Sequence, residues 1–197
     1  MKKLFGLFIL LTISLANINN ALSISSDVFI QSTVNRASQI LSKDISKDDK
    51  MSQLKLIAKE TVDIRGIGIY SLGSIRKDLN ENQKKTYSDL FKKYFLKSFS
   101  SRLAEYTNPE IEVKNKEILN KNYTIVNSVL LGTAERPEVN INWRVYTKNP
   151  ENPLIRDLII EGLSLARTQK EEFASILNSN DGDINALFKT LEKFSNN

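Results

Sequence analysis

The sequence predicts an α+β fold in which helices wrap a four-stranded, curved antiparallel sheet. Three observations support this prediction. Apolar residues recur every three or four positions in roughly the first hundred residues, they alternate with polar residues between positions 111 and 160, and the helical spacing then returns. Helices followed by hairpin-linked strands and further helices are typical of α+β proteins, because one face of such a sheet needs a helical cover.

The first 21 residues are expected to be a secretory signal peptide. Two lysines precede an apolar stretch from Leu4 to Ala16 that is short for a membrane span, and Ala16 and Ala21 are small residues at which cleavage can occur. A membrane anchor is the alternative, but asparagines follow the apolar stretch at once. Residues 22–197 are then a single exported domain, long enough for a sizeable core.

Composition excludes several classes of function. The chain has no Cys and no His, which removes disulfides, Ser-His-Asp and Cys-His catalysis, and the usual zinc and redox sites. Without the two signal-peptide lysines, 26 of the 28 basic residues remain against 23 acidic ones, a net charge of +3. This weak positive net charge suits an anionic membrane or an acidic partner, or it reflects only a compositional bias. A charge this small in an exported protein argues against nucleic-acid binding.

The N-terminal half is predicted to be helical. Residues 25–41 form a first helix with a serine cap at position 25 or 26, and Asp48 or Asp49 caps a second helix that reaches Val62. The glycines in the segment Val62–Leu79 predict short helical turns or close backbone approach, and their spacing matches no phosphate-binding loop.

The clearest predicted element is a long helix from Asn80 to Tyr106. Asn80 and Gln83 form a capping-box pattern, and Pro109 stops the helix. One stripe of this helix is apolar and mostly aromatic, whereas lysines dominate the opposite side. The stripe comprises Tyr87, Leu90, Phe91, Tyr94, Phe95, Phe99, Leu103 and Tyr106.

Four strands follow, because the apolar period changes to two. The predicted strands begin at Ile111, Tyr123, Val139 and Leu154, with turns at 132–137 and 147–153. In the second strand the residues from Tyr123 to Leu131 alternate, although Val126 and Leu130 make its other face partly apolar. Two helices, Leu165–Leu177 and Asp183–Phe194, complete the chain.

Three carboxylates beside apolar residues are candidate acids or bases. Asp63, Asp157 and Glu161 could act in an apolar pocket. The favoured interpretation is structural: each caps a helix or pairs with an arginine, because no second catalytic group is visible beside them. The aromatic stripe and the apolar sheet face either pack together as core or enclose a cavity for an apolar ligand.

The sequence resembles the periplasmic phospholipid-binding proteins of the MlaC type, the toluene-tolerance auxiliary family. Four stretches between Ile64 and Leu191 carry the resemblance: "GIYSLGSIRKDLNENQKKTYSDLFKKYF", "SRLAEYTNPEIEV", "VNINWRVYTKN" and "DLIIEGLSLARTQKEEFASILNSNDGDINALFKTL". The last contains the family's Asp-x-x-x-Glu-Gly-x-Ser-Leu pattern. The sequence departs from the family at Ile75, where Trp is usual, and at Gln169-Lys170, where Tyr-Arg is usual.

The resemblance implies a fold like that of nuclear transport factor 2 with a deep apolar cavity, and a carrier without catalytic residues or cofactor. Its expected partners are a phospholipid, an inner-membrane ABC-type transporter with a membrane-anchored lipid-domain ring, and an outer-membrane lipoprotein–porin complex. The expected role is to shuttle phospholipids across the periplasm and so maintain outer-membrane lipid asymmetry. An enzyme using Asp63 or Asp157 as a base, and an adaptor without ligand, are the alternatives.

The apolar helical stripe and the alternation in the strands are the basis for choosing the residues that line the cavity. Eleven are expected: Leu72, Phe91, Phe95, Phe99, Val129, Ile141, Trp143, Val145, Leu158, Ile160 and Leu163. Rim or structural roles are expected for Arg76, Glu161, Gly162, Ser164 and Lys170. In particular, Gly162 lets the chain bend where strand becomes helix, Glu161 meets backbone donors or an arginine, and Ser164 caps the next helix. Arg144, Arg156 or Lys170 could meet a phosphate or an acidic partner near the cavity mouth.

Overall fold

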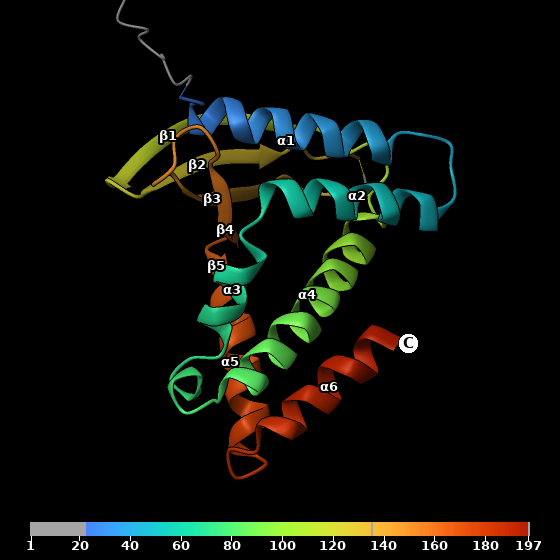
Figure 1. Cartoon of the computed structure of the whole chain (residues 1–197). Helices are drawn as coiled ribbons and strands as arrows, with labels where there is room; N and C mark the ends of the chain where they lie inside the picture. The colour runs from blue at the N-terminus through green and yellow to red at the C-terminus, as the bar shows by residue number, and fades with distance from the viewer. Residues whose placement is uncertain (1–22, 135, 197) are drawn as a thin grey trace, which may run out of the picture.

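The structure is a computed structural model that describes residues 23–134 and 136–196, so the predicted signal peptide lies outside the described residues. Helices precede and follow a single sheet along the chain, in the predicted order (Figure 1). The helices are α1 (Ser26–Leu41), α2 (Lys47–Thr61), α3 (Ile64–Ser71), α4 (Glu81–Leu103), α5 (Leu165–Asn178) and α6 (Ile184–Asn196), with a 3-10 turn η1 (Ile75–Lys77).

The sheet is open and antiparallel, with the strands in chain order. It contains β1 (Ile111–Asn120), β2 (Tyr123–Leu130), β3 (Val139–Tyr146), β4 (Leu154–Ile160) and β5 (Leu163–Ser164). The α+β class and the antiparallel arrangement are confirmed. The predicted count of four strands is wrong by one, because the two-residue β5 pairs with the end of β4 and is too short to show a period of two.

The helix starts differ in detail from those predicted. Ser25 precedes α1, but its hydroxyl bonds the Asp27 side chain and does not cap the backbone. The cap of α2 is Ser46, whose hydroxyl accepts from the amide N–H of Asp49 at 3.0 Å, so neither aspartate caps this helix. Serine and aspartate compete for the same role at such sites, and the pattern alone does not decide between them.

The glycine-rich segment forms short helical pieces, as predicted, and Gly68 is where it packs most closely. A Cβ atom at Gly68 would lie 2.7 Å from Cδ1 of Phe91. The carbonyl of Gly68 also accepts a hydrogen bond from the hydroxyl of Tyr87 at 3.0 Å. Glycine here allows α3 to contact the rings of α4.

The long helix α4 begins with the predicted capping box of Asn80 and Gln83. Its aromatic stripe forms the centre of the core. Phe91 is 2% exposed, stacks on Tyr87 with centroids 5.6 Å apart, and meets the edge of Phe173 from α5 at 6.1 Å. α6 lies alongside α4 and adds Leu187 and Leu191, which are fully buried.

The helices are distributed unequally over the sheet (Figure 1). α1 and α2 pack on each other, α1 crosses β1 and β2, and α4 runs obliquely away from α2. α3 and α5 pack on β4 at the far end of the sheet. In the described ranges, none of the helices is long and apolar enough to cross a membrane.

Candidate functional site

A pocket of about 390 Å³ lies where α1, α2, α4 and the start of α5 meet one face of the sheet. Most of its lining is apolar, and it is within the size range of small-molecule sites. The sheet contributes residues from all four long strands, among them Ile111, Leu130, Trp143 and Leu158. The pocket therefore separates helices and sheet at the place where a fully packed core would join them.

Seven of the eleven predicted lining residues border this pocket. They are Phe91, Phe95, Phe99, Ile141, Trp143, Leu158 and Ile160. Phe95 and Phe99 stack on each other with centroids 5.8 Å apart and an interplanar angle of 11°, so they form a flat apolar wall. Whether any of these residues contacts a ligand stays a prediction.

The other four lie elsewhere. Leu72 and Val145 are buried in the core cluster, with Val145 further along β3 than Trp143 and fully enclosed. Leu163, in β5, is 60% exposed. Val129 pairs with Asn140 and Glu112, and by strand alternation points away from the pocket.

The inner face of β2 is therefore the face opposite to the one predicted. Its inner face carries Val126, Ser128 and Leu130, and Leu130 lines the pocket. Both faces of this strand are partly apolar, so alternation alone did not identify the inner one. The pairing decides it, because Val126 lies opposite Trp143 and Ser128 opposite Ile141.

Several lining residues come from α1 and α2 and were not predicted as site residues. They include Val34, Ala37, Leu41, Leu54 and Ile57. Their apolar spacing was visible in the sequence but indicated only a core face. The signal that could have identified them is that three helices each present an apolar stripe to one sheet face, which is more apolar surface than one sheet needs.

Four lining residues are exposed: Tyr106 follows the end of α4, and the other three mark a mouth of the pocket between α4 and α5. Arg102 projects from α4, and Leu165 and Glu172 from α5. A hydrogen-bond chain follows the lip: the Tyr94 hydroxyl donates to Gln169 at 2.8 Å, and Gln169 donates to Glu172 at 3.0 Å. Burial raises the pKa of Tyr94, so its hydroxyl remains a donor at neutral pH. Arg102 makes no ion pair with any described residue.

The segment after β4 is a tight hairpin turn, not a simple bend into a helix. Glu161 and Gly162 form the two-residue loop between the paired residues Ile160 and Leu163, with φ of 48° and 81°. Two successive positive φ angles are the requirement of a type I′ turn, which explains the glycine. The Glu161 carboxylate accepts from the amide of Asn140 at 2.5 Å, as expected for a partner of backbone donors.

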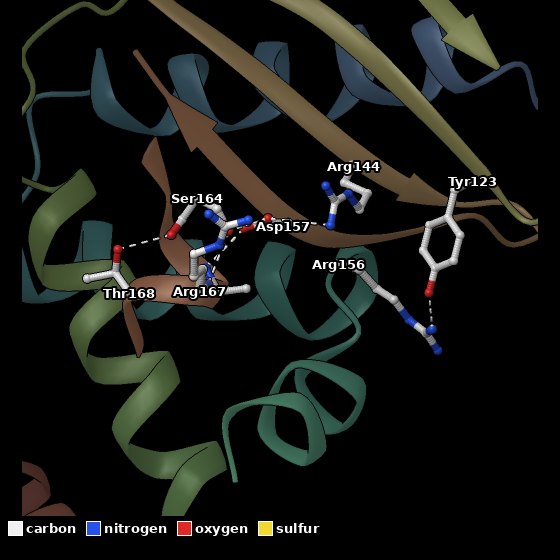
Figure 2. A network of polar contacts seen from close by, with 8 residues as sticks. Tyr123, Arg144, Arg156, Asp157, Ser164, Arg167 and Thr168 are labelled. Atoms are coloured by element: carbon white, nitrogen blue, oxygen red, sulfur yellow. Dashed lines mark hydrogen bonds and ion pairs between the residues drawn. The ribbon is translucent and has the colours of Figure 1, made fainter. Parts of the chain in front are cut away.

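The start of α5 is held by two side chains. Ser164 accepts from the amide of Arg167 at 3.1 Å and so caps the helix, as predicted. Asp157 accepts from the Ser164 hydroxyl at 2.6 Å and from the amide of Ala166 at 3.0 Å (Figure 2). These bonds fix α5 to β4 at the edge of the pocket, and a carboxylate at a helix N-terminus is favourable.

The candidate carboxylates therefore have structural partners. Asp63 caps α3 by accepting from the amide of Gly66 at 2.8 Å, and it pairs with Arg156 at 2.6 Å. None of the five residues predicted for the rim is among the residues that line the apolar pocket, and two of them, Arg76 and Lys170, lie apart from the turn and the start of α5. Arg76 donates to the carbonyl of Gly73, and the ammonium of Lys170 lies 5.4 Å from the ring centroid of Tyr70.

Comparison with known proteins places the chain in a family. The family model described as "MlaC protein" matches residues 31–193, which is most of the sequence. The chain belongs to the MlaC family. No curated protein matches the sequence.

A solved structure resembles this family member along nearly its whole length. It is a phospholipid-binding protein from Ralstonia solanacearum in complex with a phospholipid. The TM-score is 0.72 at 18% sequence identity, and the match covers 87% of this chain and 97% of the other. At this identity the likeness establishes the fold, and the helices and sheet that enclose the pocket belong to that common fold.

Proposed function

We propose that this protein is a periplasmic phospholipid carrier that holds acyl chains in the pocket between the helices and the sheet. The observation that carries the proposal is the apolar pocket itself, with its wall of Phe95, Phe99, Ile141, Trp143 and Leu158. Membership of the MlaC family and the likeness to a phospholipid-bound protein support it. The expected likeness to nuclear transport factor 2 and the predicted signal peptide are part of the same proposal.

The energetics suit a carrier. Each methylene removed from water contributes about 0.8 kcal/mol, so ten buried methylenes contribute roughly 8 kcal/mol, which keeps a tail out of water during transfer. The tail is equally shielded in a bilayer, so exchange between membrane and pocket is close to balanced. A protein that must both load and unload lipid needs this balance.

The mouth of the pocket is the proposed place of the headgroup. Arg102 has no ion pair with a described residue and borders the apolar lining, so its guanidinium is available to a lipid phosphate. The polar lip of Tyr94, Gln169 and Glu172 keeps that side hydrated. The residues Leu72, Val129, Val145 and Leu163 are not proposed as lipid contacts, because they lie outside the pocket.

The partners follow from the family and are part of the proposal. We expect an inner-membrane ABC-type transporter with a membrane-anchored lipid-domain ring on one side and an outer-membrane lipoprotein–porin complex on the other. Transfer between them would maintain outer-membrane lipid asymmetry. An enzyme using Asp63 or Asp157 is less well supported, because both carboxylates are engaged in hydrogen bonds.

A blocking variant tests the proposal. Ser98 lies half-buried on α4 and lines the pocket, whereas Ser88 lies exposed on the same helix and does not. Ser98→Trp should fill the pocket and strongly reduce copurifying phospholipid, while Ser88→Trp should load normally. Lipid content is measured by native mass spectrometry and extraction. Equal loading of both variants at equal stability would refute the assignment of this pocket to lipid.

A further inference from the structure

A second pocket of about 370 Å³ lies on the other side of the wall formed by Ile67, Asp157 and Ala166, which border both pockets. α3, the end of the β1–β2 hairpin, and β3 and β4 enclose it. Its character differs from that of the first pocket, because two arginines line it, Arg144 and Arg156. Neither belongs to the acyl-chain pocket.

The guanidinium of Arg156 is held rigidly. Its Nε donates to Asp63 at 2.6 Å. Its Nη1 donates to the Tyr123 hydroxyl at 2.6 Å (Figure 2). Its central carbon lies 3.7 Å from the ring centroid of Tyr146. No described residue accepts a hydrogen bond from its Nη2. A fixed fork with an unused donor is preorganised to bind an oxyanion.

Arg144 extends from the neighbouring strand and is only weakly paired. Its nearest carboxylate is that of Asp157, at 4.0 Å (Figure 2). That carboxylate already accepts from Ser164 and Ala166. The side chain of Arg144 is 44% exposed, so its donors are accessible to a ligand that enters from solvent.

A β-bulge brings the two arginines to one pocket. Val145 pairs with Ile155 and Arg144 with Asp157, which leaves Arg156 as the extra residue of β4. Ile155 then faces the apolar pocket and Arg156 the polar one. Bulges often redirect a side chain beside a functional site, and this bulge places two guanidinium groups in one cavity.

We infer that the second pocket binds a phosphate group between Arg144 and Arg156. Asp157 lines the pocket and Asp63 pairs with Arg156, so these two carboxylates offset the charge of the two arginines. What the pocket offers a phosphate is hydrogen-bond donors, namely Nη2 of Arg156, which has no described acceptor, and the exposed guanidinium of Arg144, and arginine binds phosphate oxygens in a fork geometry. Tyr70 and Leu119 form partly apolar sides, which suit an organic phosphate. The source is either a phospholipid headgroup, which would then lie across the shared wall in place of the proposed position beside Arg102, or a soluble phosphate ester. In the first case the inference rests on the proposed carrier function.

The test uses Arg144→Gln in the naturally processed protein, because the only ion pair of Arg144 with a described residue is the 4.0 Å contact to Asp157, so its loss should cost little stability. Lys189→Gln, on α6 and bordering neither pocket, removes the same charge as a control. Inorganic phosphate and glycerol 3-phosphate are titrated calorimetrically. Native mass spectrometry of the same preparations measures the occupancy by phospholipid and, after reloading, by a fatty acid that lacks phosphate.

A loss of phosphate or phospholipid affinity of about tenfold or more in Arg144→Gln, but not in the control, supports the site. If phospholipid occupancy falls while fatty-acid occupancy holds, the ligand is a headgroup. If Arg144→Gln weakens only the calorimetrically measured binding of inorganic phosphate or glycerol 3-phosphate, and lipid occupancy is unchanged, the ligand is a soluble phosphate. Equal behaviour of wild type and Arg144→Gln in every assay would overturn the inference and leave the arginines as structural ion pairs. Absence of lipid from all preparations, with phosphate binding retained, would contradict the carrier proposal but not this site.

Discussion

The indole Nε1 of Trp143 donates a hydrogen bond to the hydroxyl of Ser128 at 2.8 Å, across two neighbouring strands. Ser128 is 2% exposed, and its hydroxyl in turn donates to the carbonyl of Ile141 at 2.9 Å. The indole can therefore present its apolar face to the pocket while its one polar atom is satisfied. Trp143 is the single tryptophan of the sequence, so its fluorescence reports on this wall.

Ser128→Ala should remove the acceptor of this indole N–H. An unsatisfied donor beside an apolar pocket costs about 1–2 kcal/mol of the free energy of unfolding. Urea denaturation followed by Trp143 fluorescence measures it, with Ser52→Ala on the exposed face of α2 as control. A variant as stable as the wild type, with an unchanged emission maximum, would show that this hydrogen bond is unimportant.

Gly162→Val should be more harmful than Gly162→Asn. The position has φ of 81°, and an added Cβ would meet nothing within 4 Å, so the cost arises from the backbone alone. A β-branched residue is strained at this angle by about 1–3 kcal/mol, whereas asparagine tolerates it. Thermal unfolding compares the two variants. Equal melting temperatures would contradict the turn geometry proposed for residues 160–163.

Gly68→Ala should destabilise the contact between α3 and α4. The new methyl group would lie 2.7 Å from the ring of Phe91, which is buried and cannot move freely. Overpacking of this kind costs about 1–3 kcal/mol. Phe91→Leu should relieve part of the cost in the double variant, so a double-mutant cycle gives a coupling energy. Strict additivity of the two substitutions would argue against the contact.

Asp27 should contribute to stability above its ordinary pKa and lose that contribution in acid. Hydrogen bonds from Lys116, which joins α1 to β1 at 2.8 Å, and from Ser25 lower the pKa of Asp27 from 3.8 to about 2. A lowered pKa means that folding favours the ionised form, so the contribution is complete above pH 4 and disappears as pH falls through about 2.

Asp27→Asn should therefore reduce the urea midpoint at pH 7 and approach wild-type behaviour at pH 2. The effect is small, because both side chains are 38% exposed and salt screens the pair. Asp44→Asn, in the exposed connector after α1, serves as control. A wild-type to Asp27→Asn difference that stays constant between pH 7 and pH 2 would contradict the pKa shift.

The sequence predicted most elements because their signals are local. The capping box at Asn80 and the alternation from Val139 to Tyr146 depend on neighbouring residues. The inner face of β2 depends on pairing with β3, since Val129 and Leu130 are equally apolar. The fifth strand depends on the turn at Gly162, and two residues cannot show a period.

Part of the pocket lining was predicted, because its signals are also local. The apolar stripe of α4 and the alternation at the end of β4 indicated their inward faces, so Phe95 and Leu158 were correctly expected at the pocket. Val145 carries the same alternation as Trp143 but is fully buried in the core cluster and does not border the pocket, and only packing distinguishes the two. The second pocket was not predicted, because it depends on a bulge that shifts Arg156 relative to its neighbours.

The most direct test of the carrier proposal is native mass spectrometry, with lipid extraction, of the naturally processed protein purified without detergent. A carrier should show a mass increment equal to one or two phospholipids, and Ser98→Trp should lose this increment. A clean apo mass with no lipid in the organic extract would contradict it, and the apolar pocket would then need another occupant.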